Sequence, residues 1–364
     1  MASVKLPQSK ARTRKDGAAI PLDETDKRVM NLLQSTFPLD PEPFAPVAAE
    51  AGIELDDLIG RTQRLLDNRI IREITPIFDT RALGYSSMLV AAKVDSENPQ
   101  RAAKIINSHP GVSHNYLRTH EFNLWFTIAT PPDSELGLDG TLEVLQRLTG
   151  AESIRELPTL CLFKINMNLE MEGDTKALAA TAEAAAPREL DAQPYDDRDI
   201  AVIKALQGPM KVADNPYAEA AAEVGMPVAD FLSHLKGMQE RQILRRVAAI
   251  LYHRRAGFSA NGMGVWKVPD DQIMDVGAQM AAVRGVSHCY QRPTYEDWPY
   301  SVFTMAHGRS KEECDAILDS IAAEHGLHGE DRAVLYSSTE YKKIRLHYFT
   351  DEYAEWEREN APKS

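Results

Sequence analysis

The stretch GVSHCYQRPTYEDWPYSVFTMAHG, residues 285–308, decides how the rest of the chain is understood, because a similar stretch occurs earlier. Residues 111–129 read GVSHNYLRTHEFNLWFTIA, so that G-V-S-H-x-Y-x-R recurs and F-T-x-A follows in both copies. Alternate residues of a strand share one face, which predicts that His288, Tyr290 and Arg292 point the same way. An imidazole, an aromatic ring and a cation on one sheet face suit a flat, anionic and partly apolar ligand.

The similarity extends over most of the chain. Asp26 matches Asp199 and Gly52 matches Gly225, each 173 positions later, and the two GVSH segments are 174 positions apart. A nearly constant offset over this length predicts a duplicated two-domain unit.

Each unit begins with three segments of helical periodicity and a strand-like segment, which predicts a winged helix-turn-helix domain with a small β-wing. A βαββαβ pattern follows, typical of a ferredoxin-like α+β sandwich. In the first unit it closes with one long strand, residues 154–169. We expect helices on one face of each sheet and a partner on the other.

Segments rich in charge, alanine and proline separate the predicted domains. The boundaries are a disordered basic tail at 1–21, winged helix-turn-helix domains at 22–80 and 196–255, ferredoxin-like domains at 81–171 and 256–349, a linker at 172–195, and a C-terminal tail at 350–364.

Composition limits the classes of function. The 364 residues carry a formal net charge of −13, which disfavours whole-protein attraction to nucleic acid or to acidic membranes. No apolar run is long enough to span a bilayer, and the N-terminal segment lacks the apolar core of a secretory signal, so we expect a cytoplasmic protein. The three widely spaced cysteines disfavour a structural zinc site, an iron–sulfur cluster or a disulfide framework.

The third helices of the two winged domains are poorly equipped to read DNA bases. The first offers residues 61–64, Arg-Thr-Gln-Arg, flanked by aspartates, and the second offers Ser233, His234 and Lys236. We therefore expect DNA binding to be weak or lost.

The sequence resembles the siroheme decarboxylases, relatives of the Lrp/AsnC-type regulators that normally work as two homologous subunits. The resemblance covers nearly all of residues 22–349, and its most specific segments are RRVAAILYHRRAGF at 245–258 and the two GVSH stretches. It implies that two subunit types are fused in one chain. It also implies removal of carbon dioxide from two ring acetate groups of siroheme, giving 12,18-didecarboxysiroheme for haem or haem d1 synthesis. No added cofactor is implied, since the iron belongs to the substrate, and no metal site is expected.

Decarboxylation leaves an electron pair on the former acetate methylene, which must be protonated, and histidine suits that task near neutral pH. A macrocycle rimmed with carboxylates also needs aromatic walls and cations at its edge. The candidate catalytic residues are His253, His288 and His114. The candidate substrate-binding residues are Arg245, Arg246, Arg254, Arg255, Lys267, Tyr290, Arg292, Tyr295, Trp298, Tyr300, Tyr116, Arg118 and His120. His307, beside a Gly-Arg pair, is interpreted as an exposed loop group.

Two other functions remain open at this point. A tetrapyrrole-responsive transcription regulator would bind its effector on the same sheets and read DNA with the winged helices, and a tetrapyrrole carrier would bind without catalysis. In each case we expect the two halves to pair within the chain, and further pairing to a homodimer is possible.

Overall fold

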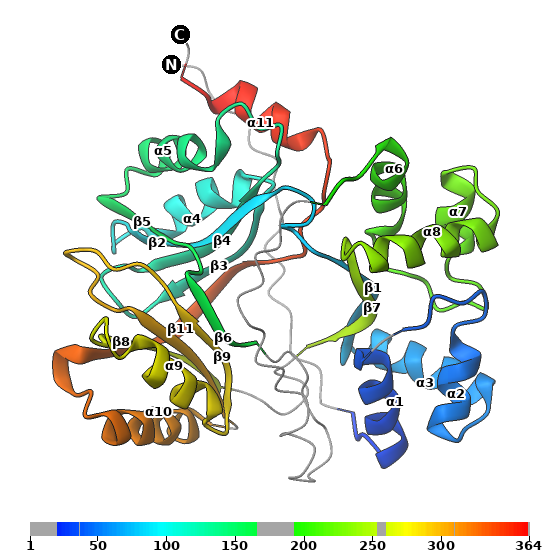
Figure 1. Cartoon of the computed structure of the whole chain (residues 1–364), viewed down its shortest axis with the longest axis horizontal. Helices are drawn as coiled ribbons and strands as arrows, with labels where there is room; N and C mark the ends of the chain where they lie inside the picture. Colours follow the sequence, from blue (N-terminus) through cyan, green and yellow to red (C-terminus); the bar gives the residue numbers. More distant parts are fainter. Residues whose placement is uncertain (1–19, 36, 166–192, 253–259, 309, 363–364) are drawn as a thin grey trace.

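The computed structural model describes residues 20–35, 37–165, 193–252, 260–308 and 310–362. It forms two parts, a pair of helical domains and a β-sandwich, with contributions from both halves of the chain to each part (Figure 1). Residues 1–19 of the predicted tail and 172–192 of the predicted linker lie outside the described residues.

The helical part contains the two predicted three-helix units. The first consists of α1 (Glu24–Ser35), α2 (Phe44–Ala51) and α3 (Leu55–Asp67), and the second of α6 (Asp197–Leu206), α7 (Ala218–Glu223) and α8 (Val228–Glu240). Both units share one hydrophobic core, which includes Val29 and Leu33 from α1 and Val202 and Leu206 from α6. These residues match at the 173-residue offset, so the core confirms the duplication.

The predicted β-wings do not form within each half. Instead β1 (Ile71–Phe78) pairs with β7 (Leu244–Leu251) of the other half as an antiparallel ribbon. Thr75 lies opposite Ala248, its own counterpart at an offset of 173, so an approximate two-fold axis passes through this pair. The ribbon therefore joins the halves rather than providing two independent wings.

The sandwich contains both predicted ferredoxin-like units. The first consists of β2 (Ser86–Lys93), α4 (Pro99–Ser108), β3 (Val112–Arg118), β4 (Leu124–Thr130), α5 (Gly137–Thr149) and β5 (Ser153–Leu157). The second consists of β8 (Ala260–Trp266), α9 (Ile273–Ala282), β9 (Val286–Gln291), β10 (Val302–Gly308), α10 (Lys311–His325), the short 3-10 helix η3 (Gly329–Asp331) and β11 (Arg332–Lys343). The predicted α+β class is confirmed.

The last strand of each unit crosses to the other half. Residues 332–336 of β11 pair with β8 in their own unit, whereas residues 337–343 pair with β3 of the first unit. The long strand expected at the end of the first unit is split, because β5 pairs with β2 but β6 (Cys161–Ile165) pairs with β9. The result is one nine-stranded sheet in the order β5-β2-β4-β3-β11-β8-β10-β9-β6.

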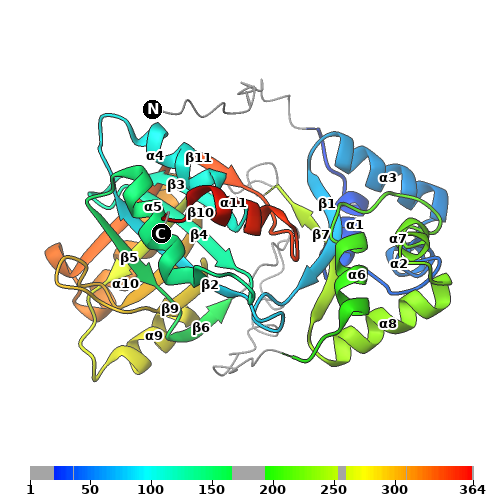
Figure 2. The same cartoon turned by 90° about the horizontal axis from the view of Figure 1, so that it is seen from above.

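The two four-stranded units face each other with their helices outside (Figures 1 and 2). Apolar and aromatic side chains fill the space between them, including Trp125 from β4, Trp298 from the loop before β10, and Phe303 from β10. The sheet faces that we expected to be left for a partner are therefore covered, over this region, by each other.

The C-terminal segment is not simply a tail, because α11 (Glu352–Asn360) packs against the helices of the first unit. Trp356 belongs to the core beneath α4 and α5, and its indole nitrogen donates to Ser108 Oγ at 3.1 Å. In the described part of the chain, no helix combines the length and apolarity required to cross a membrane.

Candidate functional site

Each GVSH segment enters its strand through a glycine that no other residue replaces easily. A Cβ atom on Gly111 would lie 1.8 Å from the carbonyl oxygen of Ala129. Gly285 has φ of +91° and faces Ile317, so a side chain there would be strained and crowded. Both glycine carbonyls accept a backbone hydrogen bond from the neighbouring strand, from Ala129 in one half and His307 in the other.

The predicted ladder of imidazole, aromatic ring and cation is present in both halves. The rings of His114 and Tyr116 stack with centroids 6.2 Å apart, and those of His288 and Tyr290 with centroids 6.0 Å apart. The guanidinium of Arg118 lies 5.7 Å from the Tyr116 ring and that of Arg292 lies 4.8 Å from the Tyr290 ring. The alternation rule thus predicted both ladders.

The F-T-x-A segments of the two copies match in sequence, but the structure aligns them with a shift of one residue. Thr127 lies opposite His114, whereas Met305, and not Thr304, lies opposite His288. A shift of one residue exchanges the faces of a strand. Accordingly, Phe126 packs toward the helices while Phe303 packs between the sheets.

In the first half, His114 lies near two cations, Lys343 and Arg72. Its pKa is lowered to about 4, mainly by burial and in addition by the charges of Lys343 and Arg72. Its Nδ1 lies 3.0 Å from Ser113 Oγ and 3.3 Å from Thr127 Oγ1, and the two hydroxyls are 2.7 Å apart. The neutral ring is thereby held in place by two hydroxyl groups.

In the second half, His288 belongs to a different network. Its Nδ1 lies 2.6 Å from Ser287 Oγ, and the same oxygen lies 2.7 Å from Nε2 of His307. The interpretation of His307 as an exposed loop group was wrong, since it is a partly buried residue of β10. Its pKa is lowered by burial and by the charge of Lys343. Lys343 thus influences a histidine from each half.

Arg118 and Arg292 are deeply placed in the sandwich. Burial lowers the pKa of each guanidinium to about 10. Arg118 donates to the carbonyl oxygen of Leu335 at 2.9 Å, and Arg292 donates to that of Leu157. Each arginine therefore fastens the point where the other half's last strand crosses the sheet, a structural role that the sequence did not suggest.

Five other predicted residues lie toward the far end of the strands from His114 and His288. His120 packs edge-on against Trp298, with ring centroids 5.2 Å apart, and Trp298 is fully buried. The other three are Tyr295, Tyr300 and Lys267. Tyr295 donates to Glu156 O at 2.6 Å, Tyr300 packs on Trp298, and Lys267 is exposed beyond the end of β8. These residues build the sandwich core and its rim, and the structure does not bring them together with the two histidines.

The β1–β7 ribbon carries several cations, of which Arg72 lies near His114. Val247, Ala249 and Leu251 pack into the helical core, so alternation places Arg246 on the opposite face of β7. Arg245 is held by Asp79 through an ion pair of 2.6 Å. In the first half Arg72, a residue that we had not singled out, donates to the carbonyl oxygen of Lys343 at 3.3 Å. The predicted His253, Arg254 and Arg255 lie outside the described residues.

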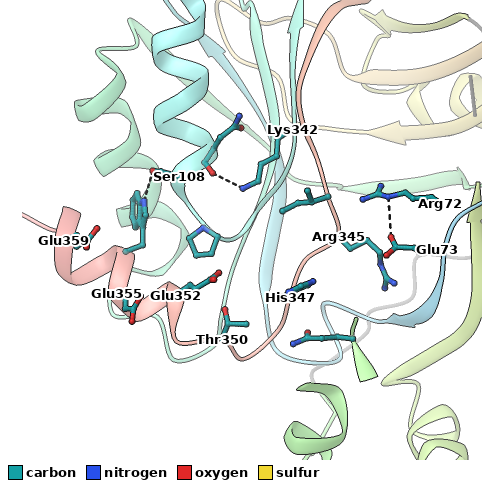
Figure 3. Close-up of a pocket in the computed structure, with 15 residues that line it drawn as sticks. Arg72, Glu73, Ser108, Lys342, Arg345, His347, Thr350, Glu352, Glu355 and Glu359 are labelled. Atoms are coloured by element: carbon teal, nitrogen blue, oxygen red, sulfur yellow. Dashed lines mark hydrogen bonds and ion pairs between the residues drawn. The ribbon is translucent and has the colours of Figure 1, made fainter. Parts of the chain in front are cut away.

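A cavity of about 640 Å³ lies behind β11, between its C-terminal end and α11 (Figure 3). Glu352, Glu355 and Glu359 of α11 line one wall, while Arg72 and Arg345 lie on the other side. None of the predicted site residues that the structure describes lines this cavity. Four glutamates and the cations Arg72, Lys342 and Arg345 line it together, so its charge is mixed.

In the part of the chain that the structure describes, no group of three or more His, Cys, Asp or Glu side chains is arranged to hold a metal ion. What the two ladders offer is a pair of partly buried imidazoles, the first of which lies near the cations Lys343 and Arg72. The imidazoles can donate protons beside an anionic, aromatic ligand.

Comparison with known proteins adds independent findings. The family described as AsnC-like ligand binding domain matches residues 82–164 and 255–342, and the family described as siroheme decarboxylase NirDL-like HTH domain matches residues 26–72 and 199–245. A siroheme decarboxylase of Hydrogenobacter thermophilus is 39% identical over 341 residues, which cover 93% of this chain and 98% of that protein.

Separate subunits match single parts of the chain. The siroheme decarboxylase beta subunit of Methanosarcina barkeri is 38% identical over 153 residues, 42% of this chain and 99% of the subunit. Among solved structures, the siroheme decarboxylase NirDL in complex with an iron-uroporphyrin III analogue has a TM-score of 0.72 and 33% identity, and covers 92% of this chain and 98% of its own.

Proposed function

The chain belongs to the siroheme decarboxylases, in the fused form that joins two subunit types, and from this premise we propose how its residues perform the reaction. It is a carboxy-lyase that acts in haem or haem d1 biosynthesis. Its substrate is siroheme, from which it removes two ring acetate carboxylates as carbon dioxide to give 12,18-didecarboxysiroheme. The observation that carries the residue assignment is the pair of GVSH ladders, each with a histidine on the inner sheet face.

In this proposal His288 and His114 are the proton donors. When carbon dioxide leaves, the bonding electron pair remains on the methylene carbon, and a proton from an imidazole converts that carbon to a methyl group. Burial keeps the His114 ring neutral at neutral pH, so its N–H donates without a charged ring being stabilised in the ground state. Two histidines in equivalent strands fit a reaction with two leaving carboxylates. Turning the ligand over between steps is the alternative.

The cations orient the carboxylates that remain. Arg72 on β1 and Lys343 on β11 lie close enough to His114 for their charges to lower its pKa, and Arg246 lies on the face of β7 away from the helical core. Tyr116 and Tyr290 provide flat walls beside the two histidines. A cation held tightly on the leaving carboxylate would stabilise the ground state and slow the reaction, whereas cations on spectator groups fix the ring. We propose no further cofactor, since the iron is part of the substrate.

DNA binding is not part of the proposal. On α3, Arg61 and Arg64 both pair with the buried Asp26, at 2.8 and 2.5 Å, and Arg61 also contacts Asp23. His234 on α8 and Arg241, directly after α8, both pair with the matching Asp199. Arg61, Arg64 and His234, three of the side chains expected to face bases, are thus used to hold the helices together, which favours the enzyme over a regulator.

Anaerobic incubation of the purified chain with siroheme, followed by mass spectrometry, tests the proposal. We expect loss of two carbon dioxide units per siroheme. Bound but unchanged siroheme would indicate the carrier or the regulator instead. A gel shift with the chain's own promoter DNA across a salt series would then separate those two, because only a regulator retains specific binding as salt rises.

A further inference from the structure

The two GVSH histidines have different hydrogen-bond partners beyond the shared serine. Ser113 in the first half contacts the hydroxyl of Thr127, a group that cannot ionise near neutral pH. Ser287 in the second half contacts the imidazole of His307 at 2.7 Å. The second half therefore contains two imidazoles joined by one hydroxyl, and the first half contains one imidazole with two hydroxyls.

Structural equivalence shows that His307 is a true difference between the halves. The backbone N–H of His307 donates to Gly285 O at 3.0 Å, and that of Ala129 donates to Gly111 O at 2.9 Å. Both residues also lie two positions after the residue opposite the GVSH histidine. An alanine thus occupies in the first half the place of the second imidazole.

The hydroxyl of Ser287 has one hydrogen to donate. The distances favour donation to the ring of His288 over donation to the carbonyl oxygen of Met305. Ser287 Oγ lies 2.6 Å from His288 Nδ1 but 3.3 Å from the carbonyl oxygen of Met305. If His307 Nε2–H donates to Ser287 Oγ, the hydroxyl donates to His288 Nδ1. The proton of the neutral His288 ring then sits on Nε2, on the side away from the serine.

We propose that His307 is a positioning residue that holds His288 as a proton donor through Ser287 and reloads it after each transfer. This rests on the proposed function. His288 Nε2 gives its proton to the carbon that has lost carbon dioxide, while Ser287 passes its proton to His288 Nδ1 and His307 Nε2–H passes its proton to Ser287. His307 Nδ1 takes up one proton from solvent, which leaves the proton of His288 on Nδ1. Before the next transfer the path runs in reverse: His288 Nε2 takes a proton from solvent, its Nδ1–H returns a proton to Ser287, Ser287 returns one to His307 Nε2, and His307 Nδ1 releases one to solvent. Each acetate-to-methyl conversion therefore consumes one solvent proton in net, and His288 is again the Nε2–H donor.

The surroundings of His307 suit a neutral relay group. Among the described residues, the titratable or charged groups that face it are His288 across Ser287 on β9 and Lys343 on β11, and β8 places the uncharged Asn261 beside it. The Lys343 charge disfavours a second positive charge on His307. The ring therefore passes protons on without remaining protonated.

Kinetics of His307→Gln tests the relay, because glutamine can hydrogen-bond to Ser287 but cannot exchange a proton between two ring nitrogens. We expect kcat to fall by about 10- to 100-fold with KM within about twofold. We also expect the pH profile of kcat to change shape, and added imidazole to restore part of the activity of His307→Ala. A purely structural role predicts neither effect. Wild-type kcat and pH profile in His307→Gln would overturn the proposal.

The first half provides the matched comparison. Ser287→Ala should reproduce the kinetic defect of His307→Gln, and the double variant should be no worse than either single variant, because all three break the same relay. Thr127→Val removes the corresponding partner of Ser113, yet it should leave the shape of the pH profile unchanged. Additive losses from His307→Gln and Ser287→Ala would contradict a shared path.

A measurement without substrate keeps this test separate from the proposed function. In ¹⁵N-histidine-labelled protein above pH 7.5, nitrogen shifts report which ring nitrogen carries the proton. We expect His288 as the Nε2–H tautomer, lost in Ser287→Ala. A proton on Nδ1 of His288 in the wild type would overturn the relay, even if siroheme is decarboxylated. Unchanged siroheme with an Nε2–H ring would overturn the decarboxylase proposal and keep the hydrogen-bond assignment.

Discussion

The two halves of this protein share a fold and a motif but differ in the chemistry placed around the motif. In the first half His114 is surrounded by two hydroxyls and the cations Lys343 and Arg72. In the second half His288 is linked through Ser287 to a second imidazole. The two copies thus keep the same backbone fold. A single position on the neighbouring strand, Ala129 in one half and His307 in the other, decides whether a second imidazole reaches the serine.

The largest expected effect comes from removing the two histidines in turn. We expect His288→Ala to lower turnover by about 10²- to 10³-fold, because it removes a proton donor together with its relay. His114→Ala should lower it less, by about tenfold, because its hydroxyl partners cannot reload the ring. Turnover is measured by product mass, and siroheme binding by absorbance titration, which should remain within a few-fold of wild type.

Product mass also decides how the halves divide the work. If each histidine serves one acetate, each variant should accumulate siroheme that has lost a single carbon dioxide. The exposed His328, replaced by alanine, is the control. Full activity in both His288→Ala and His114→Ala would show that neither ring is the acid.

The next effect concerns stability, and it separates the halves at low pH. His109 ends α4 and is buried, and burial lowers its pKa to about 3, whereas Val283 occupies the matching end of α9. An unfolded histidine titrates near 6.5, so the unfolded state takes up a proton that the folded state refuses as pH falls below 6.5. The contribution of the buried, neutral His109 ring to the free energy of unfolding is complete above that pH. We expect this free energy to fall by about 2 kcal/mol between pH 7 and pH 5.

Urea unfolding at both pH values measures this effect. His109→Val, which copies the second half, should be less stable at pH 7 but should lose less stability on acidification than wild type. His328→Val should keep the wild-type dependence on pH. If His109→Val also keeps it, the acid sensitivity belongs to another group, of which His114 is the first candidate because its pKa is also lowered.

The smallest effect tests the charge that both halves share. Lys343→Met should raise the pKa of His114 and of His307 by a few tenths of a unit to about one unit, since a nearby like charge is removed. Histidine NMR titration measures both rings in one sample. Lys342→Met is the matched control, because Lys342 lies near His109 and should raise only the pKa of that ring. An unchanged His307 would place Lys343 in the first half's site alone.

Much of the architecture could be predicted from the sequence because it depends on local pattern. The βαββαβ pattern predicted a helix between the first two strands of each unit, where α4 and α9 lie, and the alternation in GVSHxYxR predicted the two ladders. The constant offset predicted two copies of one unit. These signals lie within single segments, where side-chain period and backbone geometry are directly linked.

Pairing between distant strands could not be predicted in this way. Nothing local shows that β1 pairs with β7, or that the segment after Leu157 leaves its own sheet for β9. The apparent F-T-x-A match hid a one-residue register shift. His307 was taken for a loop group because it precedes a Gly-Arg pair, whereas β10 continues to Gly308. A bulge between Met305 and Ala306 is visible only when the partner strand is placed.

The crossing of β11 has a consequence for how the protein is made. The edge of β3 is completed only by residues 337–343, which leave the ribosome more than 200 residues after β3 itself. Until then the first sheet presents unpaired backbone groups of the kind that attract other chains. A nascent chain must therefore shield this edge for most of its synthesis. Separate genes for the two halves would shorten that interval. Fusion instead keeps the strand that completes the sheet on the same chain, and therefore at a high effective concentration near β3.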